Sequence, residues 1–305
     1  MSTSLELARA GDERAFGELV EPHRRELLVH CYRLLGSYTD AEDVLQETLL
    51  AAWRGLAGYE ERAALRTWLY RIATNRCLNA RRDASRRPAE PVAPFEVPEP
   101  TRRGEVTWLQ PWPENTHDAV ESVELAFVAG LAHLPPRQAA ALVLRDVLEF
   151  STAEVASLLD TTPTVVKGLV QRARAGIGPQ PRRPAAAVER DLAARFAAAY
   201  VAGDVAGVVA LLTDDAWLAM PPAPHEYGGR AAIAQFLTAA FGSRDRSIEL
   251  VPASAAGGPA FGGYGGGRAA TLIVLTCTST GIAAVTRFHL PELFGRFGLP
   301  DRIRH

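Results

Sequence analysis

Residues 151–174 read STAEVASLLDTTPTVVKGLVQRAR, and this stretch predicts two short helices joined by a tight turn. Ser151 and Glu154 have the spacing of a capping box, in which each side chain accepts a hydrogen bond from the other residue's backbone amide. Thr162 is expected to cap the second helix, and Pro163 stands at its first position, where proline is favoured. The pattern is typical of a helix-turn-helix.

The second of these helices has an apolar face and a polar face. Its buried face is expected to consist of Val166, Ala173 and either Leu169 or Val170, which recur at helical spacing. A helix-turn-helix directs the opposite face into the major groove of DNA. The residues expected to contact DNA there are Thr164, Lys167, Gly168, Gln171 and Arg172. Taken alone, the stretch also fits an ordinary helical hairpin with a solvated basic face.

Residues 5–82 form a second block that predicts helices. Apolar residues recur at spacings of three, four and seven over residues 16–35, and Gly36 ends that pattern. Asp40 is expected to cap a second helix, and a third helix is expected over residues 67–82.

Charge is distributed unevenly in this block, although the net charge of the whole chain is only −2. Eight arginines lie between Arg62 and Arg87, whereas residues 40–47 are acidic. An acidic segment beside a basic one indicates a protein that touches DNA with one surface and a basic protein partner with another.

The composition is that of a globular protein. The chain has 305 residues, enough for two or three domains, with 48% hydrophobic and 22% charged residues. No secretory signal is visible, and the longest apolar-rich run, residues 269–277, is shorter than the roughly 18 residues of a membrane span. We therefore expect a cytoplasmic protein without a membrane partner. Cys31, Cys77 and Cys277 are widely separated, so we expect buried reduced thiols, no metal and no cofactor.

Prolines interrupt the chain after the first block and predict an extended linker over residues 86–120. Trp108 and Trp112 lie within it and are expected to dock on another surface, because exposed large apolar side chains favour burial. A second, shorter Pro/Arg tether covers residues 178–184.

The C-terminal part predicts an α+β domain. Helical patterns come first, at residues 192–200 and 205–212, and segments rich in Val, Ile and Thr follow. The expected strands are residues 216–220, 247–252, 271–278 and 281–287. The glycine-rich run at 262–268 lacks the Lys-Ser/Thr pair of a phosphate loop and is expected to form a mobile hairpin.

Three motifs together resemble an extracytoplasmic-function (ECF) sigma factor of the sigma-70 family. Residues 134–146, LPPRQAAALVLRD, followed by the helix-turn-helix, resemble sigma region 4. Residues 40–48, DAEDVLQET, resemble region 2.2, and residues 67–79, TWLYRIATNRCLN, resemble regions 2.3 to 2.4. The resemblance covers residues 5–178 and implies all-α regions that bind RNA polymerase core and direct promoter-specific transcription initiation, without enzymatic activity.

The resemblance also implies what each part contacts. The acidic helix would dock on the β′ clamp helices of the polymerase, and region 4 on the β flap; the expected core-binding residues are Asp40, Glu42, Asp43, Gln46 and Glu47. A capped, solvated helix is the alternative for that face. The third helix and the loop at residues 59–66 would open and read the minus-10 element of promoter DNA, and region 4 would bind the minus-35 element.

Asn75 and Asn79 are one helical turn apart, so their amides share a face from which they could reach base edges. Arg71 and Arg76 would neutralise phosphates. Which residue of the preceding loop would hold an unstacked base stays open.

Residues 188–305 resemble the SnoaL-like, cone-shaped α+β barrel of the nuclear transport factor 2 superfamily, through MPP at 220–222, YGGR at 227–230 and TRF at 286–288. Its polar candidates near the mouth of a pocket are His225, Tyr227, Arg287 and His289. A structural pocket is favoured over an active site, because no acid–base pair is evident. The domain is expected to modulate the sigma factor and to be the place where an unidentified small-molecule ligand would bind.

The expected organisation is sigma region 2 at residues 5–85, the linker at 86–120, region 4 at 121–178 and the SnoaL-like domain at 188–305. The alternative is a SnoaL-like enzyme or ligand-binding sensor fused to a DNA-binding regulator.

Overall fold

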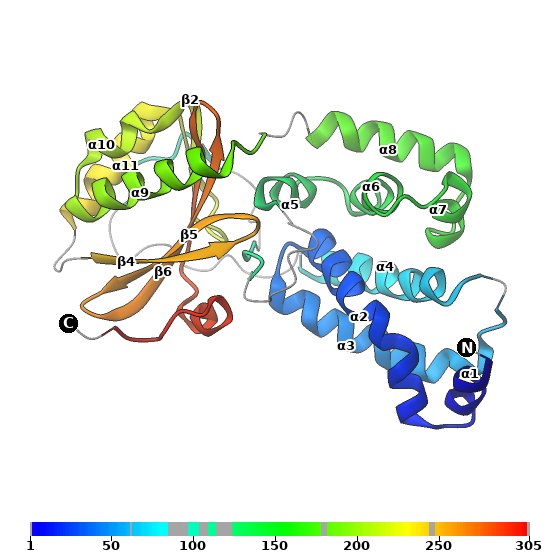
Figure 1. Ribbon diagram of the computed structural model, residues 1–305. Helices are drawn as coiled ribbons and strands as arrows, with labels where there is room; N and C mark the ends of the chain where they lie inside the picture. The colour runs from blue at the N-terminus through cyan, green and yellow to red at the C-terminus, as the bar shows by residue number, and fades with distance from the viewer. Residues whose placement is uncertain are drawn as a thin grey trace. The chain divides into compact units, whose positions relative to one another are not determined.

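The computed structural model of the chain describes residues 2–61, 63–84, 97–103, 109–113, 124–177, 182–243 and 248–303. It divides into two compact units (Figure 1). The first unit contains Met1–Arg87 and Val128–Gly178, and the second contains Pro88–Phe127 and Pro179–His305. In the part of the chain that the structure describes, no helix has the length and apolar character needed to span a membrane.

The first unit begins with four helices. They are α1 (Ser2–Arg9), α2 (Glu13–Leu35), α3 (Tyr38–Gly55) and α4 (Leu65–Ala84), with the 3-10 turn η1 (Leu56–Gly58) after α3. Gly36 ends α2 as expected, in a left-handed conformation with φ 74°. The expected cap of α3 was wrong: Ser37 is the N-cap, and its hydroxyl accepts a hydrogen bond from the backbone N–H of Asp40. Asp40 instead lies in the first turn of the helix, where an acidic side chain is favoured by the helix dipole.

The helix-turn-helix follows later in the same unit. The helices are α5 (Leu125–Ala132), α6 (Pro136–Leu142), α7 (Thr152–Leu158) and α8 (Pro163–Ile177), with a π-helical turn η2 (Val143–Val147) after α6. The capping box of α7 is present: the Ser151 N–H donates to Glu154 Oε2 at 2.8 Å, and the Glu154 N–H donates to Ser151 Oγ at 3.2 Å. The apolar face of α8 is buried as predicted, and it consists of Val166, Leu169, Val170 and Ala173.

The two helical blocks of the first unit pack on each other through α4. The rings of Tyr70 on α4 and Phe150 before α7 meet edge to face at 5.3 Å. Arg81, one helical turn from the end of α4, donates from Nη2 to the carbonyl oxygens of Ala132 at 3.0 Å and Leu134 at 2.8 Å. Helix α4 therefore belongs to the hydrophobic interior of the unit and also carries the segment expected to read the minus-10 element.

The second unit is an α+β fold. Its helices are α9 (Ala186–Ala202), α10 (Val205–Ala210) and α11 (Arg230–Gly242), followed late in the chain by the 3-10 helix η3 (Pro291–Phe297). Its strands are β1 (Arg102–Arg103), β2 (Leu212–Ala219), β3 (His225–Gly228), β4 (Ile248–Ala255), β5 (Gly258–Gly265), β6 (Arg268–Thr278) and β7 (Gly281–Phe288).

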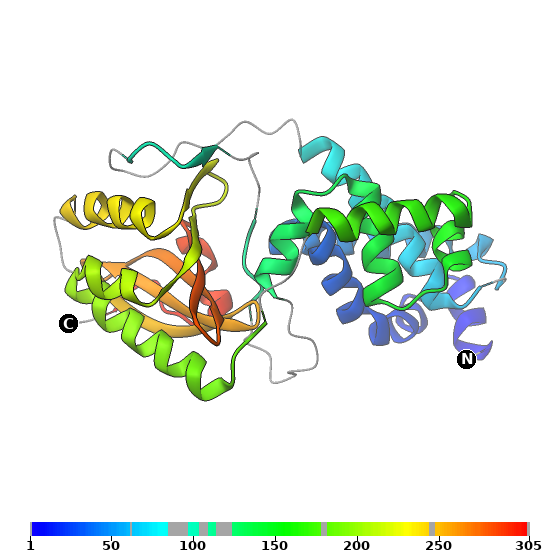
Figure 2. The same cartoon turned by 90° about the horizontal axis from the view of Figure 1, so that it is seen from above.

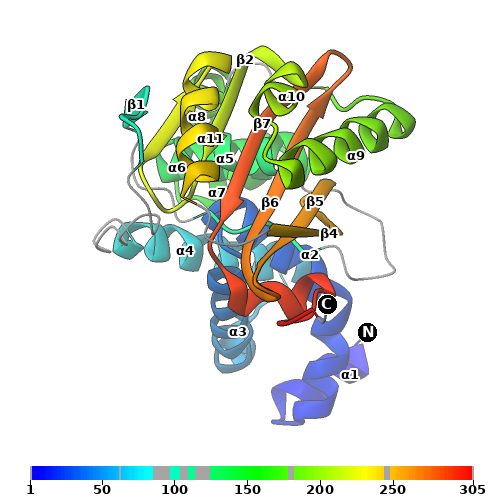
Figure 3. The ribbon, with the colours of Figure 1, turned by 90° about the vertical axis from the view of Figure 1, so that its left-hand side faces the viewer.

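These strands form one sheet in the order β1-β3-β2-β7-β6-β5-β4, in which only the β2–β7 pair is parallel. The described strands at its two ends do not pair with each other, so the sheet is open and not a closed barrel. Figures 2 and 3 show α9, α10 and α11 lined against one face of it.

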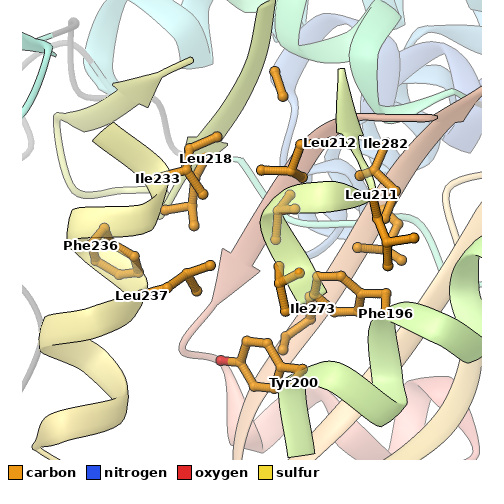
Figure 4. Packing of buried hydrophobic residues seen from close by; sticks show 14 of the residues in the cluster. Phe196, Tyr200, Leu211, Leu212, Leu218, Ile233, Phe236, Leu237, Ile273 and Ile282 are labelled. Carbon is orange, nitrogen blue, oxygen red and sulfur yellow. The ribbon is translucent and has the colours of Figure 1, made fainter. Parts of the chain in front are cut away.

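Apolar side chains from these helices and strands form the core of the second unit (Figure 4). Phe196 of α9 stacks on Tyr200 at 5.4 Å and on Phe261 of β5 at 6.2 Å. Phe236 of α11 packs against Tyr227 of β3 at 4.8 Å. The helical face of the sheet is thus lined by aromatic side chains.

The glycine-rich run corrects an expectation. Its turn does form, at Gly266 and Gly267, which both have positive φ. The residues before the turn belong to β5, which is hydrogen-bonded to β4 on one side and β6 on the other. Gly262 is buried there, and it packs so closely that a Cβ atom at this position would come within 2.7 Å of the Leu299 side chain after η3. This part of the run is a packed strand and not a mobile hairpin.

Candidate nucleic-acid interface

Helix α8 displays the expected polar face. Thr164, Lys167, Gln171 and Arg172 are exposed, and Gly168 is partly exposed between them. A Cβ atom at Gly168 would lie 3.3 Å from Nη1 of Arg172, so the glycine lets this guanidinium lie close along the helix. Lys167 and Gln171 also line an open depression of about 390 Å³ together with Arg145 and Arg174. A convex helix beside a basic hollow suits a DNA backbone and groove.

Arg174 borders this hollow but is held within region 4. Its Nε and Nη2 donate to Asp146 Oδ2 and Oδ1, both at 2.8 Å, which is the bidentate geometry that a guanidinium favours. These hydrogen bonds raise the pKa of Arg174 above its ordinary value. Sequence reasoning did not single out Arg145, Arg174 or Asp146 as neighbours, since the ion pair joins residues 28 positions apart.

Helix α4 exposes Arg71, Asn75, Arg76 and Asn79, as predicted. Three of these residues already have partners within the first unit. Arg71 Nη2 lies 3.6 Å from Asp160 Oδ1, in the turn of the helix-turn-helix. Arg76 Nη1 donates to Glu47 Oε2 at 3.2 Å, and Asn79 Oδ1 accepts from Arg82. The predicted minus-10 face therefore contacts both the acidic helix and region 4.

A partly buried polar cluster packs against α4. Arg66 donates from Nε to Glu26 Oε2 at 2.9 Å, and its Cζ lies 4.8 Å from the Tyr70 ring centre and 5.1 Å from that of Phe150. His30 Nε2 lies 2.9 Å from Thr74 Oγ1. Burial, followed by the positive charges of Arg33 and Arg66, lowers the pKa of His30 to about 3. Nothing in the local sequence pattern indicated this cluster, because its members come from α2, α4 and the start of region 4.

The loop before α4 was expected to span residues 59–66, but Leu65 already begins the helix. Tyr59 is buried, and its hydroxyl donates to the Ala63 carbonyl at 2.6 Å. Arg9 of α1 donates to the Tyr59 carbonyl and forms an ion pair with Glu61 at 3.1 Å. Arg62 lies outside the described residues. The loop is thus tied to the N-terminal helix.

The acidic face lies on α3. Asp43, Gln46 and Glu47 are exposed, whereas Asp40 and Glu42 are half-buried. Asp43 and Glu47 are one helical turn apart and share a side of the helix. Because Glu47 also pairs with Arg76, the acidic face and the basic face of α4 adjoin each other.

The four polar residues predicted for a pocket lie near one end of the sheet. Extending the β2 pairings by one residue places His225, Met220 and Arg287 in one row, which continues through Ile273 and Phe261. Arg287 is buried, with 6% of its surface exposed. Tyr227 is fully buried two residues after His225, and His289 is exposed just beyond the end of β7. Partial burial of the ring, followed by the nearby charge of Arg287, lowers the pKa of His289.

The described part of the linker belongs to the second unit and contacts its sheet. Arg102 and Arg103 form β1, which pairs with His225 and Glu226 of β3. The Tyr227 hydroxyl donates to the Pro98 carbonyl at 2.8 Å, and the Ala256 N–H donates to the Trp112 carbonyl at 2.8 Å. Trp112 is buried, as docking requires, and Trp108 lies outside the described residues.

The three cysteines are buried and do not form a metal site in the described part of the chain. Cys31, Cys77 and Cys277 are free and buried, and burial raises the pKa of Cys277 to about 11. Among the residues that the structure describes, no group of three His, Cys, Asp or Glu side chains could hold a metal ion.

Comparison with known proteins gives matches along most of the chain. Residues 19–87 match the family Sigma-70 region 2, residues 125–176 match Sigma-70, region 4, and residues 193–291 match the SnoaL-like domain.

Two relatives and one solved structure illustrate the likeness. The ECF RNA polymerase sigma factor SigG of Mycobacterium tuberculosis is 41% identical over 97% of this chain and 86% of its own length. The sigma factor SigM of the same organism is 35% identical over 54% of this chain and 76% of its own length. The crystal structure of the M. tuberculosis ECF sigma factor SigJ covers 93% of this chain and 99% of its own, with a TM-score of 0.64 at 23% identity, and so shares the fold.

The helical fold with a C-terminal helix-and-sheet domain, expected from the sequence, is thereby confirmed. Sigma regions 2 and 4 imply RNA polymerase core and promoter DNA as partners. The chain belongs to the ECF RNA polymerase sigma factors and is a transcription initiation factor that carries a SnoaL-like domain.

Proposed function

We propose that α8 reads the minus-35 element and α4 the minus-10 element of promoters for this sigma factor. The exposed row of Thr164, Lys167, Gln171 and Arg172 beside a basic depression supports the first assignment. The shared exposed face of Asn75 and Asn79 supports the second. Region 2 would extend over residues 5–85 and region 4 over 121–178, and the protein would act in the cytoplasm.

We further propose that the exposed acids of α3 bind the β′ clamp helices, while region 4 contacts the β flap. Asp43 is the best test residue, because it is exposed and, unlike Glu47, does not pair with Arg76. Asp43→Arg should weaken binding to purified core polymerase at least tenfold, since it places like charge against a basic partner. Glu21→Arg, on the exposed surface of α2, is the control. Equal retention of Asp43→Arg and wild type would remove α3 from the interface.

The SnoaL-like domain, residues 188–305, is proposed to regulate the sigma factor by holding its linker. The resemblance to ECF sigma factors implies that the linker enters the RNA-exit channel of the polymerase. A linker that is hydrogen-bonded to β3 and to Ala256 is not free to do so. The tether at residues 178–184 keeps the domain at high effective concentration beside the linker. This role is regulatory and not catalytic, which accords with membership of a family of initiation factors.

One hydrogen bond allows a narrow test. Tyr227→Phe removes only the hydroxyl that donates to Pro98. Tyr264→Phe is a matched control, because its hydroxyl donates to the Pro300 carbonyl at 2.7 Å inside the domain. Loss of about 1 kcal/mol from the linker contact should raise transcription at limiting sigma factor by up to about fivefold. Trp112→Ala should act in the same direction. If both variants and the control initiate like wild type, the domain does not regulate through the linker.

A further inference from the structure

Arg287 is a cation inside the second unit. It lies on β7 on the same face as Val285, which belongs to the hydrophobic core, and 6% of its surface is exposed. Its Nε and Nη1 atoms are fully buried and donate to no acceptor in the described part of the chain. Arg81 also has a buried Nη1 without an acceptor, but its Nη2 donates to two carbonyl oxygens.

The surroundings of Arg287 are apolar and aromatic. Its Cζ lies 5.7 Å from the centre of the Phe236 ring, and Phe236 in turn packs on Tyr227. Its partner in the strand register is Ile273, which is fully buried. Attraction between a guanidinium and an aromatic face is weaker than the loss of hydration that the buried cation suffers.

A guanidinium does not escape this loss by releasing its proton, because its pKa is too high. An anion that pairs with it inside the fold is the remaining way to compensate the charge. A single positive charge calls for a single negative charge, and a planar carboxylate matches the planar fork of donors. His289 adds no second positive charge near neutral pH, because its pKa is lowered.

We propose that Arg287 anchors a binding site inside the SnoaL-like domain for a small organic monocarboxylate, whose apolar body packs against Phe236 and Ile273. The site does not depend on whether the domain regulates transcription through its linker. A carboxylate site would explain why the core keeps an unpaired cation where an apolar residue would be more stable. Such a loss of stability is common at functional sites. Arg287 lies near the end of β7, beside the exposed His289. The carboxylate of the ligand would therefore lie nearer to solvent than its apolar body.

The test uses the full-length protein and three monocarboxylates of different shape: octanoate, cinnamate and 2-naphthoate. Each is compared with its neutral primary amide by isothermal titration and by the shift in Tm. We expect at least one acid to bind with a Kd at least tenfold lower than that of its amide. If no acid is preferred over its amide, the proposal is overturned.

Two substitutions separate binding from a structural role. Arg287→Met should abolish the preference for the acid and raise the Tm of the ligand-free protein, because an apolar side chain replaces an unpaired buried cation. Arg287→Gln, a second variant that keeps a polar group, should also lose the preference. Arg268→Met, on the exposed start of β6, is the control and should change neither quantity. A lower Tm for Arg287→Met, or an unchanged acid preference in Arg287→Gln, would mean that the arginine is structural and that no carboxylate site exists.

Discussion

Helices α4 and α8 are both expected to touch promoter DNA, but they differ in how far their polar side chains are already engaged. On α4, Arg66 bonds Glu26, Arg71 pairs with Asp160 and Arg76 pairs with Glu47. On α8, the side chains of Lys167, Gln171 and Arg172 form no hydrogen bond or ion pair with any residue that the structure describes. If both helices bind DNA as proposed, α8 would do so without losing intramolecular contacts, whereas α4 would have to exchange its present partners for phosphates and bases.

A basic helix is therefore not by itself an available DNA surface. The arginines of α4 fall into two groups. Arg66 and Arg81 make partly buried contacts that join α4 to α2 and region 4, whereas Arg71 and Arg76, which would meet phosphates, pair with acids at the surface.

Arg81→Ala should lower the free energy of unfolding of the first unit by about 3 kcal/mol. The substitution leaves the carbonyl groups of Ala132 and Leu134 without their donor and removes a partly buried side chain. Urea unfolding followed by circular dichroism measures the change. Arg82→Ala, the exposed neighbour on the same helix, is the control and should cost less than about 0.5 kcal/mol. Similar losses for the two variants would show that Arg81 does not join α4 to region 4.

Acidification should weaken the support of α4 through His30. The pKa of this imidazole is about 3 in the folded protein, below its ordinary value of 6.5. Between these pH values the unfolded chain binds a proton at His30 that the folded chain does not bind. The contribution of His30 to the free energy of unfolding is therefore complete above pH 6.5 and is lost as the pH falls. The loss should reach about 2 kcal/mol at pH 5. Comparing wild type with His30→Gln at several pH values isolates this contribution, and parallel curves for the two proteins would contradict it.

Gln171→Ala should weaken binding of the free protein to a minus-35 duplex by about tenfold, or about 1.4 kcal/mol. The duplex would come from a promoter selected by transcription with core polymerase. The double variant Asn75→Ala with Asn79→Ala should leave that binding unchanged and reduce only strand opening by the holoenzyme, measured by permanganate footprinting. If the asparagine substitutions weaken duplex binding by the free protein as much as Gln171→Ala does, the proposed difference between α4 and α8 is wrong.

The smallest effect is expected at the ion pair between Arg71 and Asp160. Both side chains are largely exposed, at 50% and 90%, so Asp160→Asn should change the free energy of unfolding by less than about 0.5 kcal/mol. It should nevertheless free Arg71 and raise initiation at limiting sigma factor by up to about twofold. Asp146→Asn, which breaks a pair confined to region 4, should not raise it. An increase with Asp146→Asn and none with Asp160→Asn would reverse the assignment.

The sequence predicted well the features that depend on neighbouring residues. The capping box at Ser151, the proline at the start of α8 and the apolar face of that helix were all local, and all are present. The exposed residues of α4 and α8 followed from helical periodicity. Strand β5 was missed because its sequence, GPAFGGYG, has almost no intrinsic strand preference and is held by pairing with β4 and β6.

The candidate site was less accessible to sequence reasoning wherever it depends on tertiary contacts. The partner of Arg71 is 89 residues away, and Arg81 reaches carbonyls more than 50 residues away. Periodicity assigns such arginines to an exposed face and cannot distinguish a phosphate contact from an internal ion pair. Arg287 was predicted, with His225 and Tyr227, to lie near the mouth of a pocket, and its burial without an acceptor for Nε and Nη1 emerged only from the fold.

The linker has one further consequence, for the solubility of the protein. Strand β1 covers the outer side of β3, and Pro113 bridges to Ala255 at the end of β4, so the linker touches both lateral margins of the sheet. Unpaired margins of a sheet offer rows of N–H and C=O groups to which another polypeptide can add as a strand. If the linker left for the polymerase, as proposed above, those rows would be uncovered at the same time. The SnoaL-like domain would then be most prone to self-association while transcription is being initiated, and return of the linker would protect it against aggregation.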